Sequence, residues 1–174
     1  MVAQTDKPIV LMGFMGSGKS TLGKQLARSL KLDFTDLDKY IESKTGRSVQ
    51  EIFSIEGESR FRVLENQYLA ELLNHPDGVV AIGGGAPCNE ENIRLIKESA
   101  LSVYLKISVP ELYIRISLSK TPRPLMAGKT GAEMENYICN LVKTREKYYD
   151  QADIIMESDC ITPDALLKAI LPYV

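Results

Sequence analysis

A glycine-rich segment near the start of the chain has the residue types and spacing of a phosphate-binding loop. Residues 13–21 read Gly-Phe-Met-Gly-Ser-Gly-Lys-Ser-Thr and fit the pattern G-x-x-x-x-G-K-[ST]. In such a loop the glycines let backbone N–H groups turn toward phosphate oxygens, and the following helix adds a partial positive charge. We expect Lys19 to reach the β- and γ-phosphates and Ser20 to place its hydroxyl on Mg²⁺. The predicted phosphate-binding residues are Gly13, Gly16, Ser17, Gly18, Lys19, Ser20 and Thr21.

Two carboxylates follow the next apolar segment, residues 32–35, which we predict as a strand. At a strand end both Asp36 and Asp38 can turn toward a ligand. One could hold Mg²⁺ through water, and the other could accept the proton of a substrate hydroxyl as a general base. The simpler alternative is that Asp38 only caps the helix expected at 39–44. Position alone leaves both interpretations open.

Three consecutive glycines, Gly83 to Gly85, follow another predicted strand at 79–82. They allow a ligand to lie against bare backbone, although a plain tight turn would explain them too. Arginines are the other chemically suggestive residues. Arg62, Arg123 and Arg145 would suit a carboxylate if they converged, because a guanidinium grips it with two parallel hydrogen bonds. Each arginine taken alone is more often a solvated surface residue.

Residues 119–131 are rich in Lys, Thr, Pro and Gly and carry Arg123 between two prolines. Phosphoryl transfer needs a closing segment, because water in an open site would compete as the acceptor. We therefore expect a lid here, with an ordinary exposed loop as the alternative.

The elements that would position these residues alternate along the chain. Short apolar runs predict strands at 9–12, 32–35, 79–82, 101–105 and 154–156. Helical patterns fall at 19–30, 38–44, 48–54, 58–74, 89–98, 109–119, 131–148 and 163–170. Strands separated by helices predict an α/β fold with a parallel sheet covered on both faces. Ligands of such sheets bind beyond the carboxyl ends of the strands.

The bulk properties are those of a single globular domain, residues 1–174. The net charge of −2 argues against non-specific nucleic-acid binding, which needs a basic face. No apolar run approaches the roughly 18 residues of a membrane span. The three cysteines suit neither a zinc site nor a disulfide framework, so we expect reduced thiols, a cytoplasmic location and no membrane partner. His75 stands in a turn-forming stretch, where we expect a surface residue.

Taken together, these segments resemble a shikimate kinase over most of the chain. The phosphate loop alone is shared by many kinases, whereas the whole set in this order and spacing is specific. The set comprises residues 13–24, Asp36-Leu-Asp38, residues 45–53, Gly57-Glu58, Phe61-Arg62 with Glu65, Gly83–Gly85, Arg123-Pro-Leu125, Arg145 with Tyr148, and Ala152-Asp153.

The resemblance implies transfer of the γ-phosphoryl of ATP to the 3-hydroxyl of shikimate, a step toward chorismate and the aromatic amino acids. It implies the nucleoside-monophosphate-kinase fold, with a five-stranded parallel sheet ordered 2-3-1-4-5 and a lid. Its implied roles are catalysis by Lys19, Asp38 and Arg123, with Arg123 also at the ATP phosphates. Metal binding falls to Ser20 and Asp36. Shikimate contacts, within a region at about 36–65 and beyond, fall to Asp38, Phe61, Arg62, Gly83, Gly84, Gly85 and Arg145.

The sequence leaves some points open. Arg60 has no assigned role, and Arg115 and residues 158–163 are candidates for the adenine site by position only. We expect a monomer. A gluconate or nucleoside-monophosphate kinase of the same fold is the nearest alternative function. A GTPase-like switch is a more distant one, because no guanine-reading Asn/Thr-Lys-x-Asp is found in the expected C-terminal half.

Overall fold

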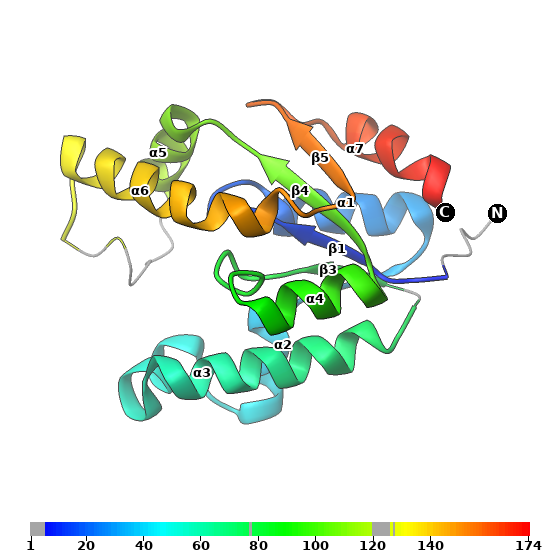
Figure 1. Cartoon of the computed structure of the whole chain (residues 1–174), viewed down its shortest axis with the longest axis horizontal. Helices are drawn as coiled ribbons and strands as arrows, with labels where there is room; N and C mark the ends of the chain where they lie inside the picture. The colour runs from blue at the N-terminus through cyan, green and yellow to red at the C-terminus, as the bar shows by residue number, and fades with distance from the viewer. Residues whose placement is uncertain (1–5, 77, 120–125, 127) are drawn as a thin grey trace.

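Five parallel strands form a single sheet in the order β2-β3-β1-β4-β5 (Figure 1). The structure is a computed structural model that describes residues 6–76, 78–119, 126 and 128–174. The strands are β1 (Ile9–Met12), β2 (Asp33–Asp36), β3 (Gly78–Ala81), β4 (Leu101–Lys106) and β5 (Ile154–Glu157). The sheet order predicted from the resemblance is therefore confirmed.

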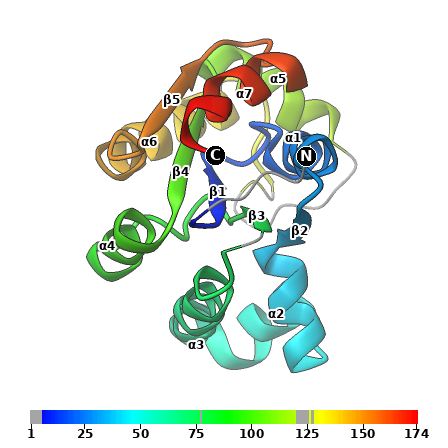
Figure 2. The same cartoon turned by 90° about the vertical axis from the view of Figure 1, so that its right-hand side faces the viewer.

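Helices cover both faces of this sheet. They are α1 (Lys19–Leu30), α2 (Leu37–Thr45), α3 (Val49–Leu73), α4 (Glu90–Ser99), α5 (Val109–Leu118), α6 (Gly131–Tyr149) and α7 (Pro163–Ile170), followed by a 3₁₀ turn at Leu171–Tyr173. Figure 2 shows α1 and α7 on one side of the sheet, with α3 and α4 on the other. This arrangement explains why β1 is apolar throughout. Ile9 and Leu11 join the core beneath α1 and α7, whereas Val10 and Met12 join the core beneath α2, α3 and α4.

A third apolar cluster ties the phosphate loop to α5 and α6. It is formed by buried side chains of Phe14, Ile107, Leu112, Ile116, Met126 and Ile138. Phe14 lies inside the loop itself and is 2% exposed. The loop is therefore anchored to the neighbouring helices by its own side chain as well as by its backbone.

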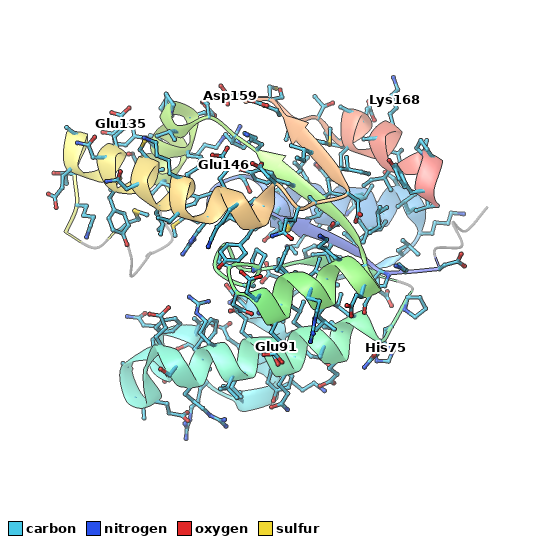
Figure 3. The ribbon with its side chains drawn as sticks, viewed as in Figure 1. His75, Glu91, Glu135, Glu146, Asp159 and Lys168 are labelled. Carbon is cyan, nitrogen blue, oxygen red and sulfur yellow. The ribbon has the colours of Figure 1, made fainter. Side chains whose placement is uncertain are left out.

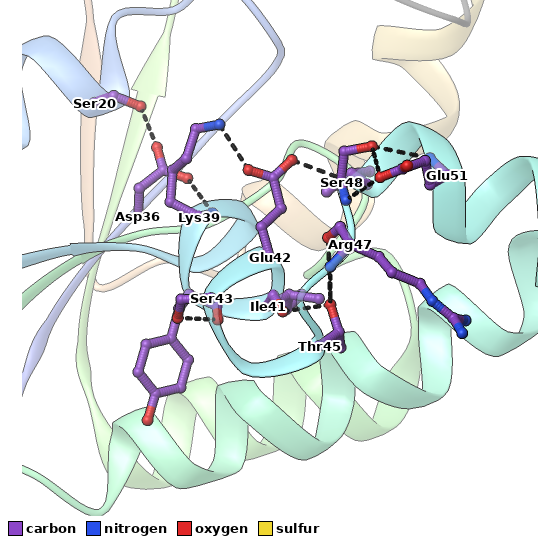
Figure 4. Close-up of polar contacts among 12 residues, drawn as sticks. Ser20, Asp36, Lys39, Ile41, Glu42, Ser43, Thr45, Arg47, Ser48 and Glu51 are labelled. Carbon is purple, nitrogen blue, oxygen red and sulfur yellow. Dashed lines mark hydrogen bonds and ion pairs between the residues drawn. The ribbon is translucent and has the colours of Figure 1, made fainter.

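The sequence predicted two helices, 48–54 and 58–74, where the structure has the single element α3. The two expectations meet at Gly57, whose backbone torsions (φ 84°, ψ 170°) are not helical and produce a kink. The start of α3 is fixed by a capping box, in which Ser48 and Glu51 bond each other's backbone N–H groups (Figure 4). Arg62 lies one turn beyond the kink.

Strand β2 begins one residue later than predicted. The backbone N–H of Leu32 still bonds to the Ala27 carbonyl of α1 at 2.9 Å, so the strand begins only at Asp33. Asp36 is consequently the last residue of β2 and pairs with Ala81. Because the strands are parallel, their carboxyl ends meet at one edge, whereas the C-terminus lies at the opposite end of the molecule (Figure 1).

Candidate active site

The phosphate loop connects β1 to α1 at the carboxyl edge of the sheet. Gly16 and Gly18 have φ values of 83° and 94°, a region that residues with a Cβ rarely adopt. A Cβ on Gly13 would lie 2.8 Å from the Leu105 carbonyl oxygen, so the loop also runs too close to β4 for a larger residue. Helix α1 begins at Lys19, and among the described residues no side chain caps it. Gly18, at the N-cap, has no side chain and so supplies no capping acceptor.

The Lys19 side chain is folded under this loop and is 9% exposed. Its ammonium group donates to the carbonyl oxygens of Gly13 at 2.8 Å and Phe14 at 2.9 Å. The positive charge is thus held at the loop where phosphates are predicted to bind.

The two predicted metal-holding residues lie in direct contact. The Ser20 hydroxyl donates to Asp36 Oδ2 at 2.6 Å, which joins the start of α1 to the end of β2 (Figure 4). The other carboxylate oxygen of Asp36 accepts the backbone N–H of Lys39 at 3.4 Å and caps α2. The helix-capping role considered for Asp38 therefore belongs to Asp36.

Asp38 lies in the first turn of α2 and is partly buried. Burial raises the pKa of its carboxyl group above the ordinary value, and the nearby Asp36 acts in the same direction, whereas Lys19 opposes them. A Cβ on Gly83 would lie 3.3 Å from Asp38 Oδ1, so the carboxyl group borders the glycine loop, residues 83–85. A carboxylate with a raised pKa is a stronger proton acceptor than an exposed one.

Arg62 is held between two carboxylates on α3. Its Nη1 donates to Glu65 at 2.7 Å and its Nη2 donates to Glu58 at 2.9 Å. Glu65 is 1% exposed, whereas the side chain of Glu58 is 64% exposed. Burial raises the pKa of Glu65 to about 6, even though the Arg62 guanidinium draws it down. Arg62 is thus fixed on one side and open to solvent on the other.

Arg145, on α6, lines the same groove as Arg62. The groove has a volume of about 710 Å³ and is also lined by Gly85 and Cys88. The Arg145 guanidinium carbon lies 5.6 Å from the centre of the Phe14 ring, within cation–π range of the phosphate loop. The structure therefore brings together Arg62 and Arg145, two of the three arginines that the sequence suggested for a carboxylate. The third, Arg123, lies outside the described residues.

Each glycine of the glycine loop borders a different functional side chain. A Cβ on Gly83 would meet Asp38 and Glu65, and one on Gly84 would lie 3.4 Å from Arg145 Nη1. On Gly85 it would lie 2.9 Å from both terminal nitrogens of Arg62. None of the three has a positive φ. A Cβ would crowd side chains at Gly83 and Gly85, whereas at Gly84 its nearest neighbours would be the backbone of the phosphate loop, Gly13 O and Met15 N, each at 3.3 Å. The sequence did not reveal this close packing.

Sequence reasoning missed two buried side chains that hold this loop. The Tyr149 hydroxyl donates to the Gly84 carbonyl, and Asn92 Nδ2 donates to the Ala86 carbonyl at 2.7 Å. Asn92 in turn accepts a hydrogen bond from Asn66 of α3 at 2.7 Å. Tyr149 follows Arg145 by four residues and so shares its helix face, which is the one signal the sequence offered.

Phe61 and Arg115 are two further predicted residues that the structure describes. Phe61 is 4% exposed and packs against Phe53, with 4.7 Å between ring centres. The Arg62 guanidinium carbon lies 5.5 Å from the centre of the Phe61 ring, so Phe61 supports Arg62 from within the core. Arg115 donates to the carbonyls of Asp159 and, at 3.4 Å, Gly16. It therefore links the phosphate loop to residues 158–163, the other adenine candidate.

Arg123 and most of the predicted lid, 119–131, lie outside the described residues. Within the described part, Met126 is buried in the third apolar cluster, and the Lys129 ammonium lies 4.7 Å from the centre of the Tyr137 ring.

Membrane-spanning helices, metal-binding clusters, the cysteines and His75 were the subject of further expectations. Among the described residues no helix is long and apolar enough to cross a membrane, and no three His, Cys, Asp or Glu side chains form a metal-binding group. Cys88, Cys139 and Cys160 are free thiols. His75 is exposed, as predicted, and follows the end of α3 (Figure 3).

Comparison with known proteins identifies the family. The sequence model of the shikimate kinase family matches residues 15–174. A shikimate kinase from Parabacteroides distasonis is 39% identical over 88% of each chain. The crystal structure of shikimate kinase from Bacteroides thetaiotaomicron superimposes with a TM-score of 0.88 at 34% identity, covering 95% of this chain and 96% of the other. That of the Acinetobacter baumannii enzyme in complex with shikimate gives 0.85 at 34% identity, covering 95% and 90%. The chain belongs to the shikimate kinase family.

Proposed function

We propose that this protein transfers the γ-phosphoryl group of ATP to the 3-hydroxyl of shikimate. The observation that carries the proposal is the meeting of Asp38, Arg62 and Arg145 at one glycine loop, beside the phosphate loop. These residues come from three different helices. They supply a proton acceptor and two carboxylate-binding groups, which is the set that a hydroxylated monocarboxylic acid requires.

The acceptor is held by its carboxylate between Arg62 and Arg145, with its ring against Gly83–Gly85 and Phe61 behind Arg62. Asp38 accepts the proton of the 3-hydroxyl as the oxygen forms its bond to the γ-phosphorus. The bond from that phosphorus to the bridging oxygen breaks, and ADP leaves. The raised pKa of Asp38 favours this role, since the carboxylate gains more from taking up the proton.

The nucleotide phosphates lie in the phosphate loop against Gly13, Gly16, Ser17, Gly18, Ser20 and Thr21. Lys19 exchanges its contacts with the Gly13 and Phe14 carbonyls for the β- and γ-phosphates and stabilises the charge that spreads over the transferred group. Arg123 reaches the same group from the lid.

Ser20 and Asp36 fit a magnesium ion, because their side-chain oxygens are 2.6 Å apart and hard oxygen ligands are those that Mg²⁺ prefers. When bound, Mg²⁺ would neutralise charge on the β- and γ-phosphates. Ser20 would bind the ion directly, and Asp36 would hold it through water.

We further propose that the single domain acts as a monomer in the cytoplasm. The free thiols agree with a reducing compartment.

A coupled assay of ADP release tests the function. With ATP and Mg²⁺ present, release should depend on shikimate and should not be supported by gluconate, AMP or the absence of an acceptor. Release with gluconate or AMP alone would overturn the assignment of the acceptor.

A substitution tests the assignment of Arg145. Arg145→Ala should chiefly raise the KM for shikimate, because the carboxylate contact exists in both ground and transition states. Lys147→Ala, two residues further along α6, is the matched control and should leave this KM unchanged. An effect of Arg145→Ala on the KM for ATP alone would show that Arg145 is misplaced.

A further inference from the structure

Tyr149, the last residue of α6, is completely buried, and its hydroxyl group makes a hydrogen bond. The ring packs in the core next to Tyr104, with 5.0 Å between ring centres. The hydroxyl donates to the carbonyl oxygen of Gly84, which lies 65 residues away in the sequence. This contact is partly buried, and the hydrogen bond fixes which way the Gly84 peptide group faces.

This hydrogen bond joins two sides of the groove described above. On one side is the Gly84 peptide. On the other is Arg145, one helical turn before Tyr149, whose Nη1 would lie 3.4 Å from a Cβ on Gly84. Within the part of the chain that the structure describes, the other donor to the Gly84 carbonyl is Cys88 Sγ at 3.5 Å, and a thiol is a weak donor. The Tyr149 hydroxyl is therefore the strong link between α6 and the glycine loop.

We propose that Tyr149 is a positioning residue for the acceptor carboxylate. By holding the Gly84 peptide against the end of α6, its hydroxyl sets the distance between Arg145 and the glycine loop, and so the width of the site. The inference rests on the proposed function. Positioning matters here because small displacements of binding groups cost large factors in the use of a substrate.

The test compares two conservative variants of the same pair of packed rings. Tyr149→Phe removes the hydroxyl that bonds Gly84 and keeps the ring. Tyr104→Phe is the matched control, because among the described residues the Tyr104 hydroxyl makes no hydrogen bond. The KM for shikimate, the KM for ATP and kcat are measured for each variant and for the unmodified chain.

Tyr149→Phe should raise the KM for shikimate roughly tenfold, the factor that accompanies the loss of one well-placed hydrogen bond. The KM for ATP and kcat should stay within about twofold, since a contact present in both ground and transition states acts on KM alone. Tyr104→Phe should leave all three values unchanged. A purely structural role would instead lower the active fraction, so that kcat falls and both KM values are kept.

Two results would overturn the role of Tyr149 and leave the proposed function standing. One is an unchanged KM for shikimate in Tyr149→Phe, and the other is a fall in kcat with both KM values kept. A third result is distinguishable from these. If the unmodified chain shows no shikimate-dependent release of ADP, the proposed function fails, and the inference fails with it.

Discussion

The buried Glu65 carboxyl group should make the unfolding free energy of the protein depend on pH, and replacing Glu65 by glutamine tests this. The Glu65 carboxylate is 1% exposed and bonds Arg62 at 2.7 Å. Its surroundings disfavour the ionised form, because burial outweighs the attraction of Arg62, and Asp38 adds a repulsive charge. Glutamine has the shape of the protonated acid and does not titrate. The pH dependence of the difference in unfolding free energy between the two proteins therefore reports the titration of Glu65 and its coupling to Asp38.

The size of the effect follows from the pKa. Its rise from the ordinary 4.5 to about 6 corresponds to about 2 kcal/mol. The folded state binds the proton more tightly than the unfolded state does. This contribution is thus fully present below pH 4.5 and is lost as the pH rises through about 6. Relative to Glu65→Gln, the unmodified chain should lose about 2 kcal/mol between about pH 4 and pH 7.

Urea unfolding of both proteins across this range, at constant ionic strength, measures the difference. Glu58→Gln is the matched control, since it removes the exposed partner of the same arginine. It should change the unfolding free energy by less than about 1 kcal/mol at any pH, because exposed ion pairs contribute little. A difference for Glu65→Gln that is constant with pH would refute the reasoning. A difference in unfolding free energy that grows in favour of the unmodified chain as the pH rises would also refute it, since the attraction of Arg62 would then outweigh the effect of burial on the pKa of Glu65.

Three further substitutions test the site and its support. Lys19→Met should lower turnover by at least about a hundredfold, because stabilisation of the transferred charge is lost. The bonds to the Gly13 and Phe14 carbonyls are lost as well, so the melting temperature should fall while the chain still folds; near-normal turnover would contradict the role of Lys19. Asp38→Asn should remove most shikimate-dependent turnover while calorimetry still detects ATP binding, and loss of ATP binding would place Asp38 on the wrong substrate. Asn92→Leu should lower the unfolding free energy in urea by roughly 2–3 kcal/mol, because the buried Ala86 carbonyl and the Asn66 amide lose their partner. A loss below about 0.5 kcal/mol would mean that these groups find other partners.

Local patterns predicted the elements that present the phosphate loop. The bounds of β1 and α1 agree with the prediction at both ends, because an apolar run and a glycine-rich turn define them without help from the rest of the chain. The break at Gly57 was also readable, since the helical pattern stops there. Element ends set by tertiary contacts were less predictable. The start of β2 depends on a bond from Leu32 to α1, and the cap of α2 fell to Asp36 because β2 carries that residue to the helix start.

Roles that depend on long-range contacts could not be predicted from the sequence. The glycine loop was expected to leave room for a ligand, and its glycines also leave room for Asp38, Arg62 and Arg145, which lie tens of residues away. Tyr149 is an ordinary core aromatic in the sequence, and only the return of α6 to the loop after β3 gives its hydroxyl a partner. Such pairings follow from topology, and no local pattern encodes them.

The two oxygens of Asp36 carry a consequence for how this position can evolve. One oxygen caps α2 and the other accepts the Ser20 hydroxyl, so if Asp36 holds Mg²⁺ as proposed, selection for folding and selection for nucleotide use act on the same carboxyl group. An asparagine would keep the cap, because asparagine is as good a cap as aspartate, but it would lose the negative charge. A lineage that abandoned phosphoryl transfer could therefore drift to asparagine at position 36 with its fold intact, whereas drift to an apolar residue would also weaken the start of α2.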